Sequence, residues 1–241
     1  MFVKKIVLSA ALSLFGLGQF SMLGSATALT IGTVLISSKK AIAQGAQVLL
    51  QSGADKFKNG DFQGAIADLN GSIEINSTSD MAYSLRAAAK HLIEDYQGAI
   101  VDYTNALKIN PDEPGTWYLR GKAKLETSEL SNQLVAPSSG FEDPIIIIRE
   151  SAIKDFNIAI KLDPDKAEFH KSRAFAKFLI EDYEQALVDF RQALFLDKSD
   201  ITLYRLMAVT HNIIGNKEVA CKNFKIALDA GDKLSVDLYN P

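Results

Sequence analysis

The stretch that decides the fold is YSLRAAAKHLIEDYQGAIVDYTNALKINP, residues 83–111. It opens on the aromatic residue Tyr83 and places the small residue Ala87 four positions later. A turn signal follows at Glu94-Asp95, and a second apolar segment then runs to Pro111. Because the apolar residues on both sides of the turn recur at helical spacing, the stretch predicts two amphipathic helices that form a hairpin.

The same pattern occurs five times along the chain. Four sets of positions repeat it in step, each at intervals of 34, 34, 53 and 34 residues, and this period predicts an array in which neighbouring hairpins stack to bury their apolar faces. The sets are the small residues Gly53, Ala87, Gly121, Ala174 and Ala208; the alanines Ala65, Ala99, Ala152, Ala186 and Ala220; the large residues Leu69, Tyr103, Phe156, Phe190 and Phe224; and the small residues Ser72, Ala106, Ala159, Ala193 and Ala227. Each repeat also opens on a large residue: Leu49, Tyr83, Trp117, His170 and Tyr204.

A 34-residue period with these residue types resembles the tetratricopeptide repeat (TPR) family over about residues 46–232. Pro111 and Pro164 match the terminal proline of that family's pattern, whereas Ser77 and Lys198 depart from it. The resemblance implies an all-α fold: a right-handed superhelical solenoid of five TPR-like helix-turn-helix hairpins after an N-terminal hydrophobic helix. The predicted repeats are 46–79, 80–113, 114–166, 167–200 and 201–232, with a C-terminal tail at 233–241.

The third repeat contains 19 extra residues, Ser131–Arg149, at the turn between its two helices. Pro137-Ser138-Ser139-Gly140 is a loop signal. Asp143-Pro144 is typical of a helix start, so the four isoleucines at 145–148 are expected to lengthen the second helix by about one turn. Both an enlarged loop and a specific docking element fit this segment.

A set of charges follows the same period. An arginine precedes the small residue in the three middle repeats, and an aspartate occupies the second helix of each, whereas the last repeat has Met207 and Asn223 in these places. These arginines could bind a ligand, but we expect ion pairs that brace the two helices, because an unpaired buried charge is costly. The pairs are Arg86 with Asp102, Arg120 with Asp155, and Arg173 with Asp189.

Residues 1–45 differ from the rest of the chain. Lys4-Lys5 precede a stretch without charge, residues 6–38, which is long enough to span a bilayer. A cleaved signal peptide also fits, with Ala41-Ile42-Ala43 or Ala26-Thr27-Ala28 as cleavage patterns. The segment is therefore interpreted as a signal peptide or a membrane anchor. We expect an exported, periplasmic or extracytoplasmic protein, or one anchored in a membrane through residues 6–38.

The remaining composition favours a non-catalytic protein. Four of the 26 basic residues lie before Ala46, which leaves 22 against 29 acidic residues and a net charge of about −7, unsuited to nucleic acid. His91, His170 and His211 lie in different repeats without metal-ligand spacing, and Cys221 has no cysteine partner. No phosphate-binding loop or nucleophile motif is present. We therefore expect no enzyme activity, no cofactor and no metal.

The resemblance also implies a binding surface. In the TPR family the first helix of each hairpin lines a concave groove that binds a protein or peptide. The side chains that this implies are Leu50, Ala54 and Phe57; Ser84, Ala88 and His91; Tyr118, Lys122 and Leu125; Lys171, Phe175 and Phe178; and Arg205, Val209 and Asn212. The family's carboxylate clamp is not reproduced, because Leu50 and Ala54 stand where it would begin.

The fourth repeat is the most aromatic part of the predicted groove. Phe175 and Phe178 lie near Lys171, so we expect an apolar anchor on the partner with an acidic group beside it. The alternative is that both rings pack between repeats. A homo-oligomer is a second functional hypothesis, because the few residues after 232 are too short for a full capping helix and an uncapped solenoid end favours self-association.

Overall fold

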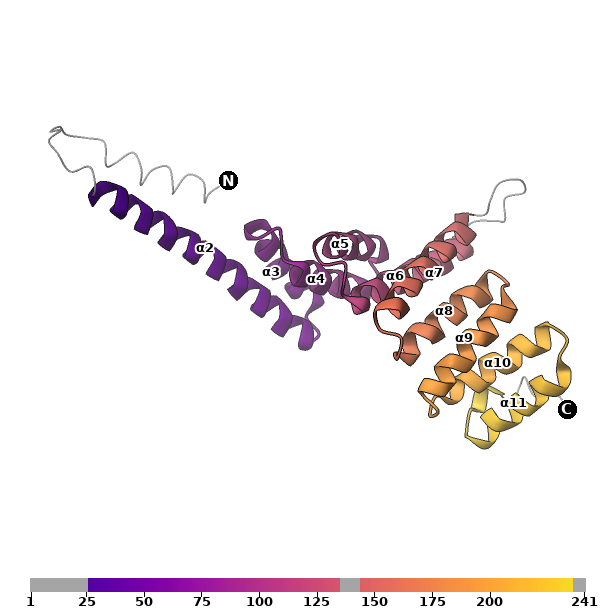
Figure 1. The fold of residues 1–241 in the computed structure, drawn as a ribbon. Coiled ribbons are helices and arrows are strands. Elements are labelled where there is room, and N and C mark those ends of the chain that lie inside the picture. Colours follow the sequence, from indigo (N-terminus) through magenta and orange to yellow (C-terminus); the bar gives the residue numbers. More distant parts are fainter. Residues whose placement is uncertain (1–25, 135–143, 236–241) are drawn as a thin grey trace. The chain divides into compact units, whose positions relative to one another are not determined.

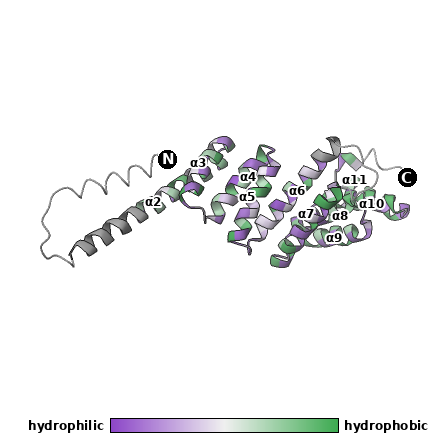
Figure 2. Ribbon diagram, turned by 90° about the horizontal axis from the view of Figure 1, so that it is seen from above, coloured by the Kyte–Doolittle hydropathy of each residue, from purple (hydrophilic) through white to green (hydrophobic). Residues whose placement is uncertain are grey.

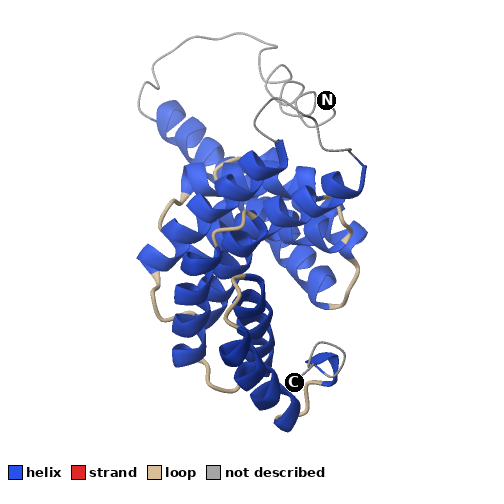
Figure 3. Cartoon of the chain, turned by 90° about the vertical axis from the view of Figure 1, so that its right-hand side faces the viewer, coloured by secondary structure: helices blue, strands red, loops and turns tan. Residues whose placement is uncertain are grey.

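The computed structural model describes residues 26–134 and 144–235. The chain divides into two parts, Met1–Gln44 and Gly45–Pro241, and each is described by itself. Over the described ranges the regular structure is entirely helical (Figure 3).

The helices from Gly45 onward form successive antiparallel pairs, and each pair packs on the next (Figure 1). This arrangement confirms the predicted all-α solenoid of stacked hairpins. The helices are α2 (Ala26–Lys58), α3 (Phe62–Ile75), α4 (Asp80–Leu92), α5 (Tyr96–Ile109), α6 (Pro114–Leu134), α7 (Pro144–Leu162), α8 (Ala167–Leu179), α9 (Tyr183–Leu196), α10 (Ile201–Ile213) and α11 (Lys217–Asp229), and a 3-10 turn follows at Lys233–Ser235.

In the first, second, fourth and last hairpins, the turns form where the repeated pattern predicts them. Glu94 and Glu181 adopt a positive φ of 64°, the conformation that Gly60 and Gly215 adopt more easily in the first and last hairpins. The next residue then begins the second helix: the Asp95 carboxylate accepts a 2.9 Å hydrogen bond from the backbone N–H of Gly98. A helix stop and a helix start therefore occupy only a few residues.

Small residues allow the paired helices to approach closely. At Gly121 of α6, an added Cβ would lie 2.7 Å from the ring of Phe156 on α7, so only glycine leaves room for that buried ring. Apolar and polar residues both occur along the helices that carry hydropathy colours (Figure 2). The apolar side chains gather in clusters between neighbouring helices, and the alanines of the repeat are almost fully buried in them.

The third hairpin is longer than the others. Helix α7 begins at Pro144, as predicted, and Ile145 is buried whereas Ile146 and Ile147 are exposed. The extra residues were expected at the turn between the two helices, and α6 continues into them as far as Leu134. The extra residues therefore lengthen both helices, and the loop signal at residues 137–140 lies outside the described residues.

The predicted hydrophobic segment, residues 6–38, falls largely on residues 1–25, which are outside the described residues. Within the described ranges, no helix combines the length and apolar character needed to cross a bilayer.

Candidate functional site

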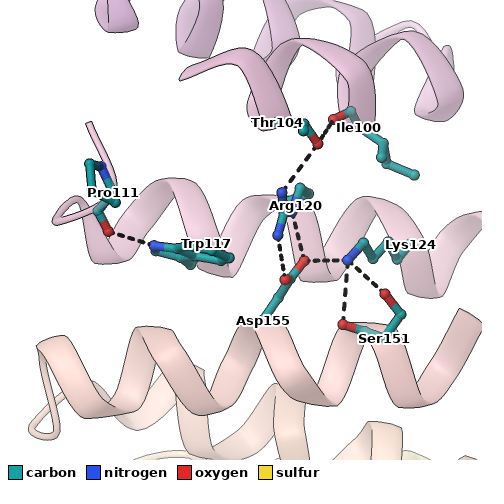
Figure 4. Close-up of polar contacts among 8 residues, drawn as sticks. All are labelled: Ile100, Thr104, Pro111, Trp117, Arg120, Lys124, Ser151 and Asp155. Carbon is teal, nitrogen blue, oxygen red and sulfur yellow. Dashed lines mark hydrogen bonds and ion pairs between the residues drawn. The ribbon is translucent and has the colours of Figure 1, made fainter. Parts of the chain in front are cut away.

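The partly buried arginines of the middle hairpins form ion pairs with buried aspartates, as predicted. In the third hairpin, Arg120 on α6 binds both carboxylate oxygens of Asp155 on α7, with Nη2–Oδ1 at 2.7 Å and Nε–Oδ2 at 2.9 Å (Figure 4). Lys124 Nζ lies 2.7 Å from the same carboxylate. Burial lowers the pKa of Lys124, and its contact with Asp155 opposes that shift. The other pairs match: Arg86 and Lys90 bind Asp102, and Arg173 and Lys177 bind Asp189.

Each of these arginines also reaches the preceding hairpin. Arg120 Nη1 donates to Thr104 Oγ1 on α5 at 3.2 Å (Figure 4). Asn70 and Asn157 take this role for Arg86 and Arg173, at 2.7 and 2.8 Å. Each guanidinium therefore links its own helix to the second helix of its hairpin and to the second helix of the preceding hairpin. Because all of its bonds are within the chain, a structural role is favoured over ligand binding for these arginines.

A cavity of about 560 Å³ lies on the face that the first helices form. Helices α6, α8 and α10 supply its walls, and α6 and α8 are first helices of consecutive hairpins (Figure 1). The volume is in the range of sites that accept a small molecule or a few side chains of a peptide. We call it the first-helix cavity, and its lining residues are Tyr118, Lys122, Leu125, Glu126, Glu129, Glu168, Lys171, Ser172, Phe175 and Leu206.

The cavity brings together five of the predicted groove residues: Tyr118, Lys122, Leu125, Lys171 and Phe175. Tyr118 is held against Phe169, with ring centroids 4.8 Å apart. Leu125 is buried in the cluster that also contacts Phe175. The apolar wall is therefore positioned by the hairpin core and needs no rearrangement to form.

The other predicted groove residues lie elsewhere. Leu50 is buried in the core of the first hairpin, Phe57 packs edge-on against Phe62, and Phe178 packs against Tyr183 and the cluster around Leu187. The remaining polar ones are Ser84, 3.3 Å from Thr116 Oγ1; His91, paired with Glu126; Arg205, bonded to Asp232 at 2.7 Å; and Asn212, which is exposed. Of the two candidate anchor rings, only Phe175 lines the cavity.

The charges of the cavity differ from the expected basic patch. Lys171 Nζ binds Asp200 at 2.5 Å and Thr202 Oγ1 at 2.9 Å. Burial raises the pKa of Asp200, but the hydrogen bonds from Lys171 and Thr202 outweigh it and hold that pKa below its ordinary value. Since Lys171 already has a carboxylate partner, it is not a free base beside Phe175.

Three glutamates line the cavity, and the sequence interpretation missed all of them. Glu126 Oε2 lies 2.5 Å from His91 Nε2, although the atoms do not have hydrogen-bond geometry and Oε2 accepts no hydrogen bond. Glu129 belongs to the added length of α6, where the other hairpins turn. Glu168 lies in the first turn of α8. The position of Glu129 could have been found from the sequence, because residues 126–134 contain no glycine or proline to end the helix.

No cluster of three or more His, Cys, Asp or Glu that could hold a metal occurs in the part of the chain that the structure describes. Among the histidines, His170 has a structural contact: its Nε2 lies 2.9 Å from the carbonyl oxygen of Pro164. Trp117 makes the equivalent contact with Pro111 at 2.7 Å, so both rings secure the link from the preceding hairpin.

Solved structures with the same fold are numerous. YrrB, described as a TPR protein with an unusual peptide-binding site, matches with a TM-score of 0.68 at 17% identity, over 83% of this chain and 95% of that one. MamA from Desulfovibrio magneticus RS-1 matches with a TM-score of 0.67 at 15% identity, over 80% and 97%. Pseudomonas aeruginosa PilF matches with a TM-score of 0.61 at 15% identity, over 83% and 90%.

These likenesses show that the chain has the TPR fold. No family model matches the sequence, and no curated protein matches it either. Since the identities are low, the fold is what these structures establish, and the function must be argued from the site.

Proposed function

We propose that the protein is a non-catalytic interaction scaffold that binds a segment of another protein in the first-helix cavity. The observation that carries this proposal is the cavity itself, with Tyr118, Leu125, Phe175 and Leu206 as apolar wall. Interface energy concentrates in a few aromatic and aliphatic anchors held in such pockets. YrrB, which has the same fold and a peptide-binding site by its description, gives the proposal a precedent.

The proposal is tested by site-specific photo-crosslinking in cells. A photoreactive residue at Ser172 faces the cavity, and the matched control is one at Gln192, exposed on α9. We expect a defined crosslinked protein from Ser172 and not from Gln192. If both positions give the same products, or neither gives any, the cavity is not a protein-binding site.

Aromatic substitutions separate binding from folding. Phe175→Ala should weaken binding of the crosslinked partner by at least roughly 2 kcal/mol, about thirtyfold, and lower stability only modestly. Phe195→Ala is the matched control, because this α9 ring is 72% exposed and lies outside the cavity. Phe178→Ala should cost about 3–5 kcal/mol of stability, because the ring packs in the fourth hairpin's core.

We further propose that the solenoid is exported or tethered to a membrane. The uncharged stretch at residues 6–38 after Lys4-Lys5 supports this location. N-terminal sequencing of the protein isolated from cells should find a start at Gln44 or Leu29, or an intact N-terminus in the membrane fraction. Full-length protein recovered free in the cytoplasm would contradict the proposal.

Self-association is the second candidate function. Apolar side chains of the last hairpin and its flanking turn are exposed, among them Leu234 at 62%, Ile213 at 48% and Ile226 at 45%. Light scattering distinguishes the two candidates, because only self-association raises the mass with protein concentration. A constant monomer mass would contradict self-association, and the scaffold would remain as the proposed function.

A further inference from the structure

We infer that the partner segment is a basic-apolar peptide, one that places a lysine or arginine beside an aromatic or large aliphatic side chain. The inference rests on the scaffold proposal and names the chemistry of its partner. It reverses the expectation of an acidic partner group beside Lys171.

The first step is the charge balance of the cavity. Its lining holds three carboxylates, on Glu126, Glu129 and Glu168, and two amines, on Lys122 and Lys171. Asp200 binds Lys171 at 2.5 Å and neutralises it. Lys122 is then the single uncommitted amine of the lining, and the carboxylates outnumber it.

The second step is which carboxylates a ligand could use. Glu129 and Glu168 are exposed, and neither has an ion-pair partner in the described part of the chain. Glu126 is committed within the chain, because its Oε2 is buried and lies 2.5 Å from His91 Nε2, so a ligand would use Glu129 and Glu168. A lysine or arginine side chain supplies the donors that these carboxylates lack, and charge-assisted bonds are the stronger kind.

The third step is the apolar wall beside these carboxylates. Tyr118, Phe175 and Leu206 line the same cavity, so a purely charged ligand would leave the wall uncovered. A segment with an apolar side chain next to a cation covers the wall and meets the carboxylates at once. The cation can also lie over an aromatic face, which adds to the attraction.

The lengthened third hairpin takes part in this chemistry. Glu129 lies beyond the point where the other first helices end, in the added turns of α6. The continuation of α6 past the usual turn therefore extends the first-helix wall and places this carboxylate on it. Glu129 itself precedes the 19 extra residues, Ser131–Arg149, so the part in recognition belongs to the lengthened α6.

The test is a selection of random peptides on the purified full chain, followed by titration of the enriched sequences. We expect enriched peptides with a net positive charge and an aromatic or large aliphatic residue next to Lys or Arg. Their binding should weaken at least about tenfold in the double variant Glu129→Lys/Glu168→Lys, and weaken with rising salt. The matched control is Glu74→Lys/Glu150→Lys, which makes the same change of charge at exposed sites outside the cavity and should bind as the wild type does.

The outcomes distinguish the two proposals. Peptides that lose binding with Phe175→Ala but are neutral or acidic would overturn the basic-apolar inference and leave the scaffold function standing. Equal weakening in both charge variants would also overturn it, because the effect would then come from net charge alone. No enrichment over a blank surface would overturn the peptide-binding function itself. Circular dichroism of each variant shows that the compared proteins are folded.

Discussion

The third and the last hairpins both join two helices, but different side chains lie between the helices. Between α6 and α7, Asp155 is buried and is bound by Arg120 and Lys124. Between α10 and α11 the matching positions hold Met207, Asn223 and His211. There Asn223 bonds only within its own helix, to the carbonyl of Val219 at 2.9 Å. A charged brace is therefore not required to join the two helices of a hairpin.

The difference shows what the ion pair of arginine, lysine and aspartate contributes to the stack. Arg120 also bonds Thr104 of the preceding hairpin, so it fixes the register between hairpins as well as within one. The first hairpin is intermediate, because Ser52 replaces the arginine while Lys56 keeps its contact with Asp68 at 2.7 Å. The full brace is present in the three middle hairpins, each of which has neighbours on both sides.

The largest expected effect comes from removing the shared carboxylate. Asp155→Leu leaves the partly buried Arg120 and Lys124 without their shared carboxylate and should lower the free energy of unfolding by about 3–5 kcal/mol. Asn223→Leu in the last hairpin is the matched substitution and should change it by less than about 1 kcal/mol, since no charge is orphaned. Urea denaturation of both variants measures the difference. Similar losses would mean that the buried carboxylate makes no special contribution.

A smaller effect is expected when the arginine is removed and the carboxylate stays. Arg173→Met leaves Asp189 paired with Lys177 at 2.8 Å, so the loss should be about 1–3 kcal/mol. Adding Asp189→Asn and Lys177→His reproduces the residues of the last hairpin. This triple variant should recover much of the loss, because the buried carboxylate that has lost one of its two partners is then replaced. Strictly additive losses in the mutant cycle would show that the three residues do not interact.

These residues also show how far the sequence predicts the structure. Arginine and aspartate recur at the repeat's intervals, so the ion pairs could be predicted from periodicity and the cost of a lone buried charge. The lysines Lys90, Lys124 and Lys177 recur equally and could have been found in the same way. Asn70, Thr104 and Asn157 share a position but not a chemical type, and only coordinates show that each accepts from a guanidinium.

The candidate site was predictable in part. The first helices of the third and fourth hairpins were expected to line one surface, and the cavity there includes Tyr118 and Phe175. Phe178 is three residues further along α8, and a small rotation of the helix decides which ring faces the cavity. Glu129 was missed because a turn was expected where α6 continues. Periodicity predicts which face of a helix a residue occupies only to within about one residue. That precision is too low to distinguish a ring that lines the cavity from one that packs in the core.

A third prediction concerns the bond between hairpins. Thr104→Val removes the acceptor of Arg120 Nη1 with little change in side-chain shape and should cost about 1 kcal/mol. Thr210 on α10 is the matched control: its Oγ1 donates to Leu206 O within the same helix, as Thr104 Oγ1 does to Ile100 O. Thr210→Val should thus report the loss of the intrahelical bond alone. Urea denaturation measures both losses of stability. Equal losses would mean that the bond between hairpins contributes nothing measurable.

The smallest expected effect is a pH dependence confined to the last hairpin. His211 stands where the middle hairpins have lysine. Burial lowers its pKa, Arg191 lowers it further, and Glu184 opposes them in part. Its Nδ1 is buried and has no hydrogen-bond partner, so the folded structure offers little to a protonated ring. The unfolded chain, with an ordinary histidine pKa of 6.5, binds the proton more readily.

The sign of the effect follows from this difference. Stability from the neutral ring is fully present above about pH 6.5 and is lost as the pH falls through the lower pKa of the folded state. Urea denaturation at about pH 7.5 and 5.5 should therefore show a decrease for the wild type. His211→Gln should show a smaller decrease, and the difference isolates His211 from His91 and His170. An unchanged pH dependence in that variant would mean that the last hairpin tolerates a charge in its core position as well as the middle hairpins do.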